Sequence, residues 1–135
     1  MQQIHDFFSK EDKFARHAGI ELLEVREGWA RTAMKIEPFH MNGAKTVHGG
    51  AIFTLADFAF AVASNSRGSL AMGINTSVSF VKAATEGTLY AEATEESCNT
   101  KLATYLVRVT DEADALIALF QGTVYRKKEP IHTRL

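Results

Sequence analysis

The sequence predicts an α+β fold in which one long central helix is wrapped by a curved antiparallel sheet of six strands. The apolar stretch from Gly50 to Ser66 consists of strong helix formers. Six other stretches, two before this helix and four after it, have the alternation or the bounding turn residues of β-strands. No second long helix is present to cover a parallel crossover, so the sheet must be mostly antiparallel.

Length and charge exclude several classes of protein. The 135 residues correspond to one domain, residues 1–135, and the formal net charge of -1 gives no electrostatic basis for binding nucleic acid or a membrane surface. No stretch is long and apolar enough to span a membrane. The amino terminus lacks the apolar core of a signal peptide, and the single cysteine, Cys98, suits a reducing compartment. We therefore expect a cytoplasmic protein.

The first elements are a helix and a hairpin. Apolar residues from Ile4 to His17 recur at steps of three and four, the spacing of one helical face, so a short amphipathic helix should end at Gly19. Residues Ile20–Val25 and Trp29–Ile36 tend to alternate between apolar and polar, and residues 26–28 read as a tight turn. The sequence therefore predicts a β-hairpin after the first helix.

A loop leads into the central helix. Residues 37–50, EPFHMNGAKTVHGG, contain Pro, Asn-Gly and Gly-Gly, which interrupt regular structure. The helix that follows is apolar on almost every face, which is typical of a helix buried inside a fold. Because one sheet covers only one side of it, we expect a second copy of the chain to close the other side.

Four strands are predicted after the helix, at roughly residues 71–82, 88–96, 102–110 and 116–127. Turn residues at Glu86-Gly87 and Cys98-Asn99 stand where hairpins would need them, and an acidic turn, residues 111–114, precedes the last strand. One helix held in one curved antiparallel sheet is the hotdog arrangement.

Asp57 is the first candidate for a catalytic role. It is the only charged residue between Ala51 and Ser66. A lone carboxylate in so apolar a helix is unfavourable unless it is hydrogen-bonded, paired or used in chemistry, and Asp has poor propensity for a helix interior. The alternative is a core Asp whose hydrogen bonds are satisfied.

The start of the helix is the second candidate. At His48-Gly49-Gly50 the backbone N–H groups of the first turn are unpaired, and the helix dipole adds partial positive charge there, so a carbonyl or oxyanion could bind. Most Gly-Gly pairs, however, are simply turns. Eight residues separate Gly49 from Asp57, or about 12 Å of helix, too far for both to reach one carbonyl. If both act on one substrate, a two-fold axis must bring them together from different subunits.

The stretch NGAKTVHGGAIFTLADFAFAVASNSRG, with the spacing N-G-x-x-x-x-H-G-G-x-x-x-x-L-x-D, resembles the signature of the phenylacetic-acid-degradation (PaaI-like) branch of the hotdog acyl-CoA thioesterases. The stretches FVKAATEGTLYAEA and ALFQGTVYRKK are similar to later strands of that family, so the resemblance covers most of the chain. It implies hydrolysis of acyl-CoA, of aryl or phenylacetyl type, to the free acid and coenzyme A. It also implies a homodimer assembled as a homotetramer, and no cofactor besides the coenzyme A of the substrate.

The resemblance also implies roles for individual residues. Asp57 would be the nucleophile, or the general base for water, and the Gly49 N–H would polarise the acyl carbonyl. Asn42 would position the attacking group or the thioester, His48 would shape the loop rather than transfer protons, and Gly50 would lie against the substrate. The residues of the loop and helix start of one subunit would face Asp57 of its partner.

One position departs from the family pattern. Some relatives carry a Ser on the strand after the helix, near the catalytic carboxylate, and the matching position here is Gly73. Asn75 or Ser77 on the same strand could replace it. A small basic cluster ends the last strand and is expected either to be solvated or to contact the phosphates of coenzyme A: Arg126, Lys127 and Lys128.

Two other functions stay open. One is a hotdog hydratase or dehydratase, and the short loop before His48 argues against it. The other is a non-catalytic acyl-CoA-binding module, over which the carboxylate at Asp57 favours an enzyme. A DNA-binding regulator is disfavoured because the roughly 18 residues before Gly19 are too few for a helix-turn-helix. The five histidines lack the spacing and partners of a metal site, so no metal is expected.

Overall fold

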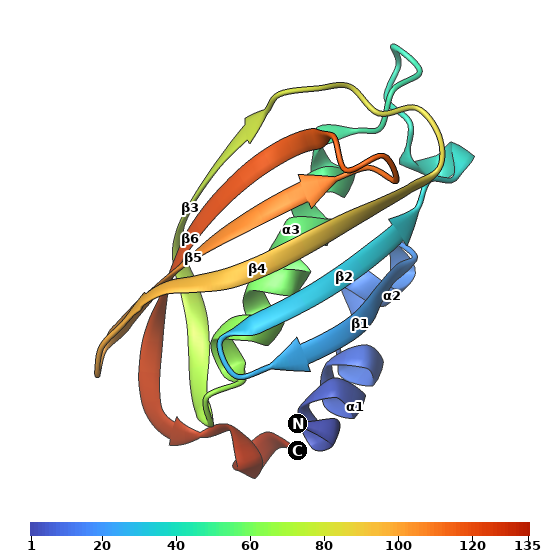
Figure 1. Ribbon diagram of the computed structural model, residues 1–135. Coiled ribbons are helices and arrows are strands. Elements are labelled where there is room, and N and C mark those ends of the chain that lie inside the picture. The colour runs from blue at the N-terminus through green and yellow to red at the C-terminus, as the bar shows by residue number, and fades with distance from the viewer.

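The computed structural model describes all residues from Met1 to Leu135, and one curved antiparallel sheet holds a single long helix on its concave side (Figure 1). The strands lie in the order β1-β2-β4-β5-β6-β3, and every neighbouring pair is antiparallel. They are β1 (Ile20–Arg26), β2 (Trp29–Lys35), β3 (Ser69–Phe80), β4 (Thr88–Cys98), β5 (Leu102–Thr110) and β6 (Leu116–Pro130). The helices are α1 (Gln2–Glu11), α2 (Lys13–His17) and α3 (Gly49–Asn65), with short 3-10 turns η1 (Pro38–His40) and η2 (Ile131–Arg134). The predicted hotdog fold is confirmed.

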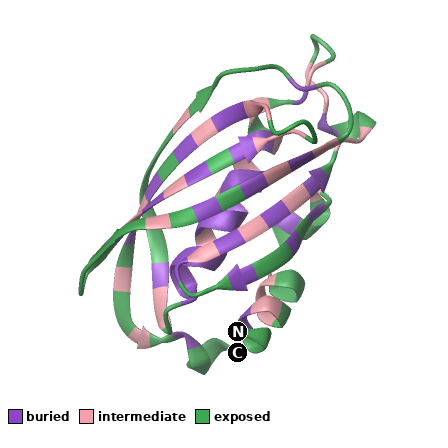
Figure 2. Ribbon diagram, viewed as in Figure 1, coloured by how far each residue is buried: buried purple, intermediate pink, exposed green.

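The sheet buries one face against α3. Buried and more exposed residues alternate along β2, β4 and β5, as Figure 2 shows, because successive side chains of a strand point to opposite faces. Many of the residues that face the helix are small, which lets helix and sheet approach closely. The buried residues of β2 and β4 are Ala30, Thr32, Met34, Leu89, Ala91 and Ala93.

Helix α3 is buried on most of its circumference. Its remaining side is a stripe of residues spaced by four, three and four positions, and these are exposed or only partly covered: Gly50, Thr54, Asp57 and Ala61. The predicted helix began at Gly50 and ended at Ser66, so each boundary is one residue away from the observed one. No helix in the protein combines the length and apolarity needed to cross a membrane.

The carboxyl end of α3 is tied to the β1–β2 turn and to strand β4. Ser66 Oγ accepts a 2.7 Å hydrogen bond from the Gly28 N–H in the β1–β2 turn. Arg67 makes two hydrogen bonds to Glu95 on β4, of 2.6 and 2.8 Å, and this partner lowers the pKa of the Glu95 carboxyl. The helix that carries Asp57 is therefore fixed at this end.

The start of α3 is tied to the amino-terminal helices by buried His40. Its Nδ1 accepts the Glu37 N–H at 2.9 Å, so the proton lies on Nε2, which is 2.6 Å from the carbonyl oxygen of Ala18. The carbonyl of His40 accepts the N–H of His48 at 2.7 Å. His40 thus links the end of α2, through its side chain, to His48 at the start of α3, through its backbone carbonyl.

Two sequence predictions about local structure are wrong. The opening helix is divided into α1 and α2 at Asp12, whose Oδ1 accepts the Ala15 N–H at 3.1 Å and caps the second piece. Glu86-Gly87 is not a hairpin turn, because β3 pairs with β6 and the chain crosses to place β4 between β2 and β5. The turn predicted at Cys98-Asn99 does join a hairpin, of β4 and β5.

Candidate active site

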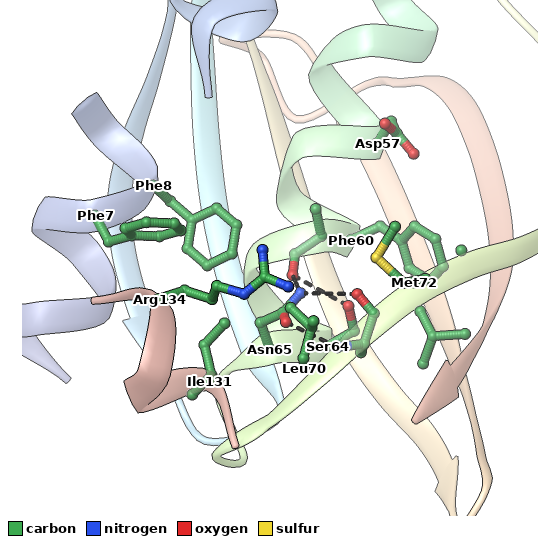
Figure 3. A pocket seen from close by; sticks show the side chains of 14 residues that line it. Phe7, Phe8, Asp57, Phe60, Ser64, Asn65, Leu70, Met72, Ile131 and Arg134 are labelled. Carbon is green, nitrogen blue, oxygen red and sulfur yellow. Dashed lines mark hydrogen bonds between the residues drawn. The ribbon is translucent and has the colours of Figure 1, made fainter. Parts of the chain in front are cut away.

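Asp57 lines an apolar pocket of about 310 Å³, which we call the Asp57 pocket (Figure 3). One wall is α3, from Asp57 to Asn65, and a second is the first half of β3, from Leu70 to Gly73. The remaining lining comes from Val124 on β6 and from the two ends of the chain: Phe7 and Phe8 on α1, and Ile131 and Arg134 on η2. The sequence pattern predicts Asp57 as a site residue but none of these chain-end residues.

The Asp57 carboxylate is half-buried and has no hydrogen-bond partner within the chain. Burial raises the pKa of this carboxyl above its usual value, and the nearby negative charge of Asp12 raises it further. A carboxylate of raised pKa is a stronger base than an ordinary Asp. The group is therefore free to accept a proton from, or to attack, a molecule in the pocket.

The first turn of α3 leaves one backbone donor free. His48 begins the helix, with its Nδ1 accepting the Gly50 N–H at 2.7 Å and its carbonyl accepting from Ala51 and Ile52. The Gly49 N–H makes no hydrogen bond within the chain. The ring and the carbonyl of His48 are thus both occupied by hydrogen bonds within the first turn. The backbone N–H of Gly49 is the donor that remains available to a ligand.

Gly49 lies in a second pocket, of about 390 Å³, together with Asn42 and Phe80. The Phe80 ring covers the glycine so closely that a Cβ there would lie 3.2 Å from its Cζ. Asn42 Oδ1 accepts the N–H groups of Ala44 and Thr46, and its Nδ2 donates to the Thr46 hydroxyl at 2.9 Å. The second Nδ2 hydrogen of Asn42 remains available.

The structure therefore brings Asn42 and Gly49 together, with His48 between them along the chain, but it does not bring them to Asp57 within one chain. Eight residues of α3 separate the Gly49 and Asp57 positions, about 12 Å along the helix axis. Gly50 is exposed at the helix start, and a Cβ there would lie 2.9 Å from His48 Nδ1. That glycine thus makes room for the cap.

Strand β3 places Gly73 beside Asp57. Gly73 lines the Asp57 pocket and abuts the Phe60 ring, since a Cβ there would come within 3.2 Å of it. Asn75 and Ser77 lie on the opposite face of the sheet from α3. They pair with Thr123 and Gln121 on β6. Gly122, which lies between these two residues, faces Phe60 of α3, so its two neighbours point to the other face.

An irregularity between Gly73 and Asn75 causes this change of face. After it, Thr76 pairs with Gly122, whose α-carbon faces Phe60 of α3. Thr76 is thus the first hydroxyl after Gly73 on the helix side of the strand. Strict alternation in the sequence could not indicate it, because a bulge shifts the alternation by one residue.

The basic residues at the end of β6 differ in their surroundings. Arg126 is partly buried, and its Nη1 donates a 2.7 Å hydrogen bond to the Asn99 carbonyl in the β4–β5 turn. Lys127 and Lys128 are exposed and have no carboxylate partner. Arg126 thus stabilises a turn, whereas the two lysines are open to solvent.

Comparison with known proteins gives consistent matches. A family model described as the thioesterase superfamily matches residues 44–118. A relative from Archaeoglobus fulgidus is 46% identical over 130 residues, 96% of this chain and 84% of the relative. Acyl-coenzyme A thioesterase PaaI of Escherichia coli is 31% identical over 126 residues, 93% of this chain and 89% of that protein. The solved structure of E. coli PaaI superposes with a TM-score of 0.91 at 29% identity, covering 96% of this chain and 94% of that one.

Proposed function

The chain belongs to the thioesterase superfamily and is a thioester hydrolase with the hotdog fold of PaaI, and on this basis we propose that it hydrolyses acyl-CoA thioesters to the free acid and coenzyme A. The observation that carries the proposal is the free Asp57 carboxylate, of raised pKa, at the wall of an apolar pocket. Phe7, Phe8 and Phe60 in that pocket support an aryl or phenylacetyl-type acyl group.

Each chemical step has a candidate group. Asp57 takes a proton from a water that attacks the thioester carbonyl carbon, and the coenzyme A thiolate leaves. Alternatively, Asp57 attacks that carbon itself and the thiolate leaves, and water then hydrolyses the resulting acyl-Asp57 anhydride to the free acid and the restored carboxylate. The Gly49 N–H donates to the carbonyl oxygen as negative charge develops on it. The remaining Nδ2 hydrogen of Asn42 is directed to the thioester or the attacking group, and His48 acts only by capping α3.

The proposed working unit is a homodimer. Asp57 belongs to the uncovered stripe of α3 with Gly50, Thr54 and Ala61, so a second chain packed on this stripe completes the burial of the helix. Two α3 helices packed antiparallel would place Asp57 of one chain beside Gly49 of the other. Strand β3 is at the edge of the sheet, and pairing of two β3 strands would extend the sheet across the dimer. We propose that two such dimers form a tetramer.

The coenzyme A moiety is proposed to lie on the surface. Lys127 and Lys128 are exposed at the end of β6 and carry charge suited to its phosphates. Arg126 contributes indirectly, by holding the β4–β5 turn beside them.

The test is a thiol-release assay on the purified protein with short, medium, long and aryl acyl-CoAs. The proposal expects turnover that is highest with aryl or phenylacetyl-type substrates and is lost in Asp57→Asn. If no acyl-CoA is hydrolysed, but acyl-CoAs bind in calorimetry, the protein is a binding module instead. Preference for a non-aryl substrate would contradict the proposed specificity and leave the hydrolase in place.

A further inference from the structure

A second cavity adjoins the Asp57 pocket at the end away from Asp57. An outer cavity of about 760 Å³ lies between α1 and the last residues of the chain, where the two termini meet (Figure 1). Six of the eight residues that line the outer cavity are polar or charged, among them Asp6, Lys10, Glu11 and His132. Phe7 and Arg134 line both cavities. These two side chains therefore form the partition between an apolar pocket and a polar one.

Both halves of the partition are held in place. Phe7 packs edge to face against Phe8, with ring centroids 5.3 Å apart and an 86° angle between the planes. Arg134 forms two hydrogen bonds to Glu129, from Nε at 3.3 Å and from Nη2 at 3.1 Å. The adjacent Ile131 is buried and anchors η2. The partition is thus built from ordered contacts of α1 and of the chain end.

The partition lies at the opposite end of the pocket from Asp57. In Figure 3 Arg134 extends from η2 toward the end of α3 near Asn65, while Asp57 lies at the other end of the labelled group. Eight residues separate Asp57 from Asn65, which corresponds to about 12 Å along the helix. An acyl group whose carbonyl is at Asp57 would therefore point its distal end at Phe7 and Arg134.

We propose that Phe7 and Arg134 set the upper limit on acyl length, so that compact acyl groups are accepted and long alkyl chains are rejected. The inference rests on the proposed acyl-CoA hydrolysis. A long chain could extend only by displacing the Phe7 ring and by bringing its methylenes against the Arg134 guanidinium, a charge that is unfavourable to desolvate. Neither residue falls within residues 44–118, so this limit is carried by segments outside the part of the chain that the superfamily model matches.

The experiment compares kcat/KM for palmitoyl-CoA and phenylacetyl-CoA in the wild type and in Phe7→Ala and Arg134→Ala. Opening the partition should raise the palmitoyl to phenylacetyl ratio by about tenfold or more, since apolar pockets discriminate a single methylene by roughly ten- to two-hundredfold. The gain should come from a lower KM for palmitoyl-CoA. The matched control is Phe14→Ala, because Phe14 is an exposed α2 residue that lines neither cavity.

A wild-type enzyme that already prefers palmitoyl-CoA would overturn the inference, as would an unchanged ratio in variants that melt like the wild type. If Phe7→Ala does not fold, Arg134→Ala decides, because its side chain is 54% exposed on the last turn. Wild-type protein that cleaves no thioester would instead overturn the proposed function, and this inference with it. Cleavage with an unchanged ratio would overturn the length limit alone.

Discussion

The ring of Phe60 on α3 lies directly against Gly122 on β6, so closely that a Cβ on the glycine would be 2.6 Å from the ring Cζ. The same ring faces Gly73 on β3, and it packs on Tyr105 and Phe120 at centroid distances of 5.9 and 5.5 Å. Two glycines thus provide the space that one large side chain of α3 fills. Phe60 also lines the Asp57 pocket, so this contact fixes the depth of the helix in the sheet and one wall of the site.

We predict that Gly122→Ala destabilises the protein by about 1 to 3 kcal/mol, the usual cost of overpacking a core. Gly73→Ala should cost less, because its Cβ would be 3.2 Å from the ring and a small shift relieves the contact. Gly43→Ala is the control, since a Cβ there meets no atom within 4 Å. Chemical denaturation of the three variants checks the order, and a Gly122→Ala variant as stable as Gly43→Ala would contradict it.

Asp57→Asn should lower kcat by about 10²-fold or more, because the proposed catalytic base or nucleophile is lost. The same variant should be more stable than the wild type at neutral pH. The folded state raises the pKa of Asp57, so it binds this proton more tightly than the unfolded state, and the ionised carboxylate destabilises the fold. The difference in stability between Asp57→Asn and the wild type should shrink as the pH falls through the pKa of Asp57 in the folded protein. It should vanish below the pKa of an Asp in the unfolded chain. Denaturation curves measured at several pH values test the stability difference, and kcat measurements test the loss of activity.

Asp12→Asn should shift the acidic limb of the kcat/KM profile to lower pH. The limb reports ionisation of Asp57, whose pKa is raised first by burial and second by the Asp12 charge, and only the second contribution is removed. Asn caps a helix as well as Asp does, so α2 should keep its start. Asp6→Asn, on the exposed part of α1, is the control. A limb that does not move would show that Asp12 has no influence on the catalytic carboxylate.

Gly49→Val should abolish turnover, and Gly49→Ala should reduce it to an intermediate level. Loss of one oxyanion donor typically lowers kcat by about 10²- to 10³-fold. In Gly49→Ala the new Cβ would press on the half-exposed Phe80 ring. The double variant Gly49→Ala/Phe80→Ala separates the two causes, since recovered activity would assign the loss to the displaced ring. If Gly49→Val lowers the melting temperature while its folded fraction turns over normally, the glycine is a turn residue and the donor assignment is wrong.

Mixing two inactive variants should restore activity. Asp57→Ala chains and Gly49→Val chains, refolded together, would form heterodimers in which one site has both an intact Asp57 and an intact helix start. The expected recovery is about half of the wild-type activity per heterodimer, because one of its two sites carries both lesions. Isolated heterodimers that remain inactive would mean that both groups act within one chain. Each variant refolded alone is the control.

The sequence predicted the architecture well because its signals were local. The apolar run of α3 and the strand at residues 102–110 depend on residue type over a short window, and the structure has them within one residue of the predicted bounds. The uniform apolarity of α3 also indicated a helix inside a sheet. Asp57 could be predicted as a candidate catalytic residue because a single charge in an apolar helix is unfavourable unless it is paired or functional.

The features that were missed depend on contacts between distant segments. The break at Asp12 lies within an amphipathic pattern that continues on both sides of it, so periodicity could not reveal it. The bulge after Gly73 places Thr76, rather than Asn75 or Ser77, on the helix side, and only pairing with β6 determines it. Phe7 and Arg134 are more than a hundred residues apart in the sequence and meet only because the chain ends converge.

The sequence of edge strand β3 affects the solubility of a single, unassociated chain. Its twelve residues, SLAMGINTSVSF, contain no charge and no proline, two of the devices by which natural proteins keep an open sheet edge from joining other strands. Met72 and Ile74 on it are exposed. Before the proposed pairing of two chains, a newly made chain thus carries an exposed, aggregation-prone sheet edge. Variants that weaken association should therefore be lost first as insoluble protein during expression, before any defect in turnover is measured.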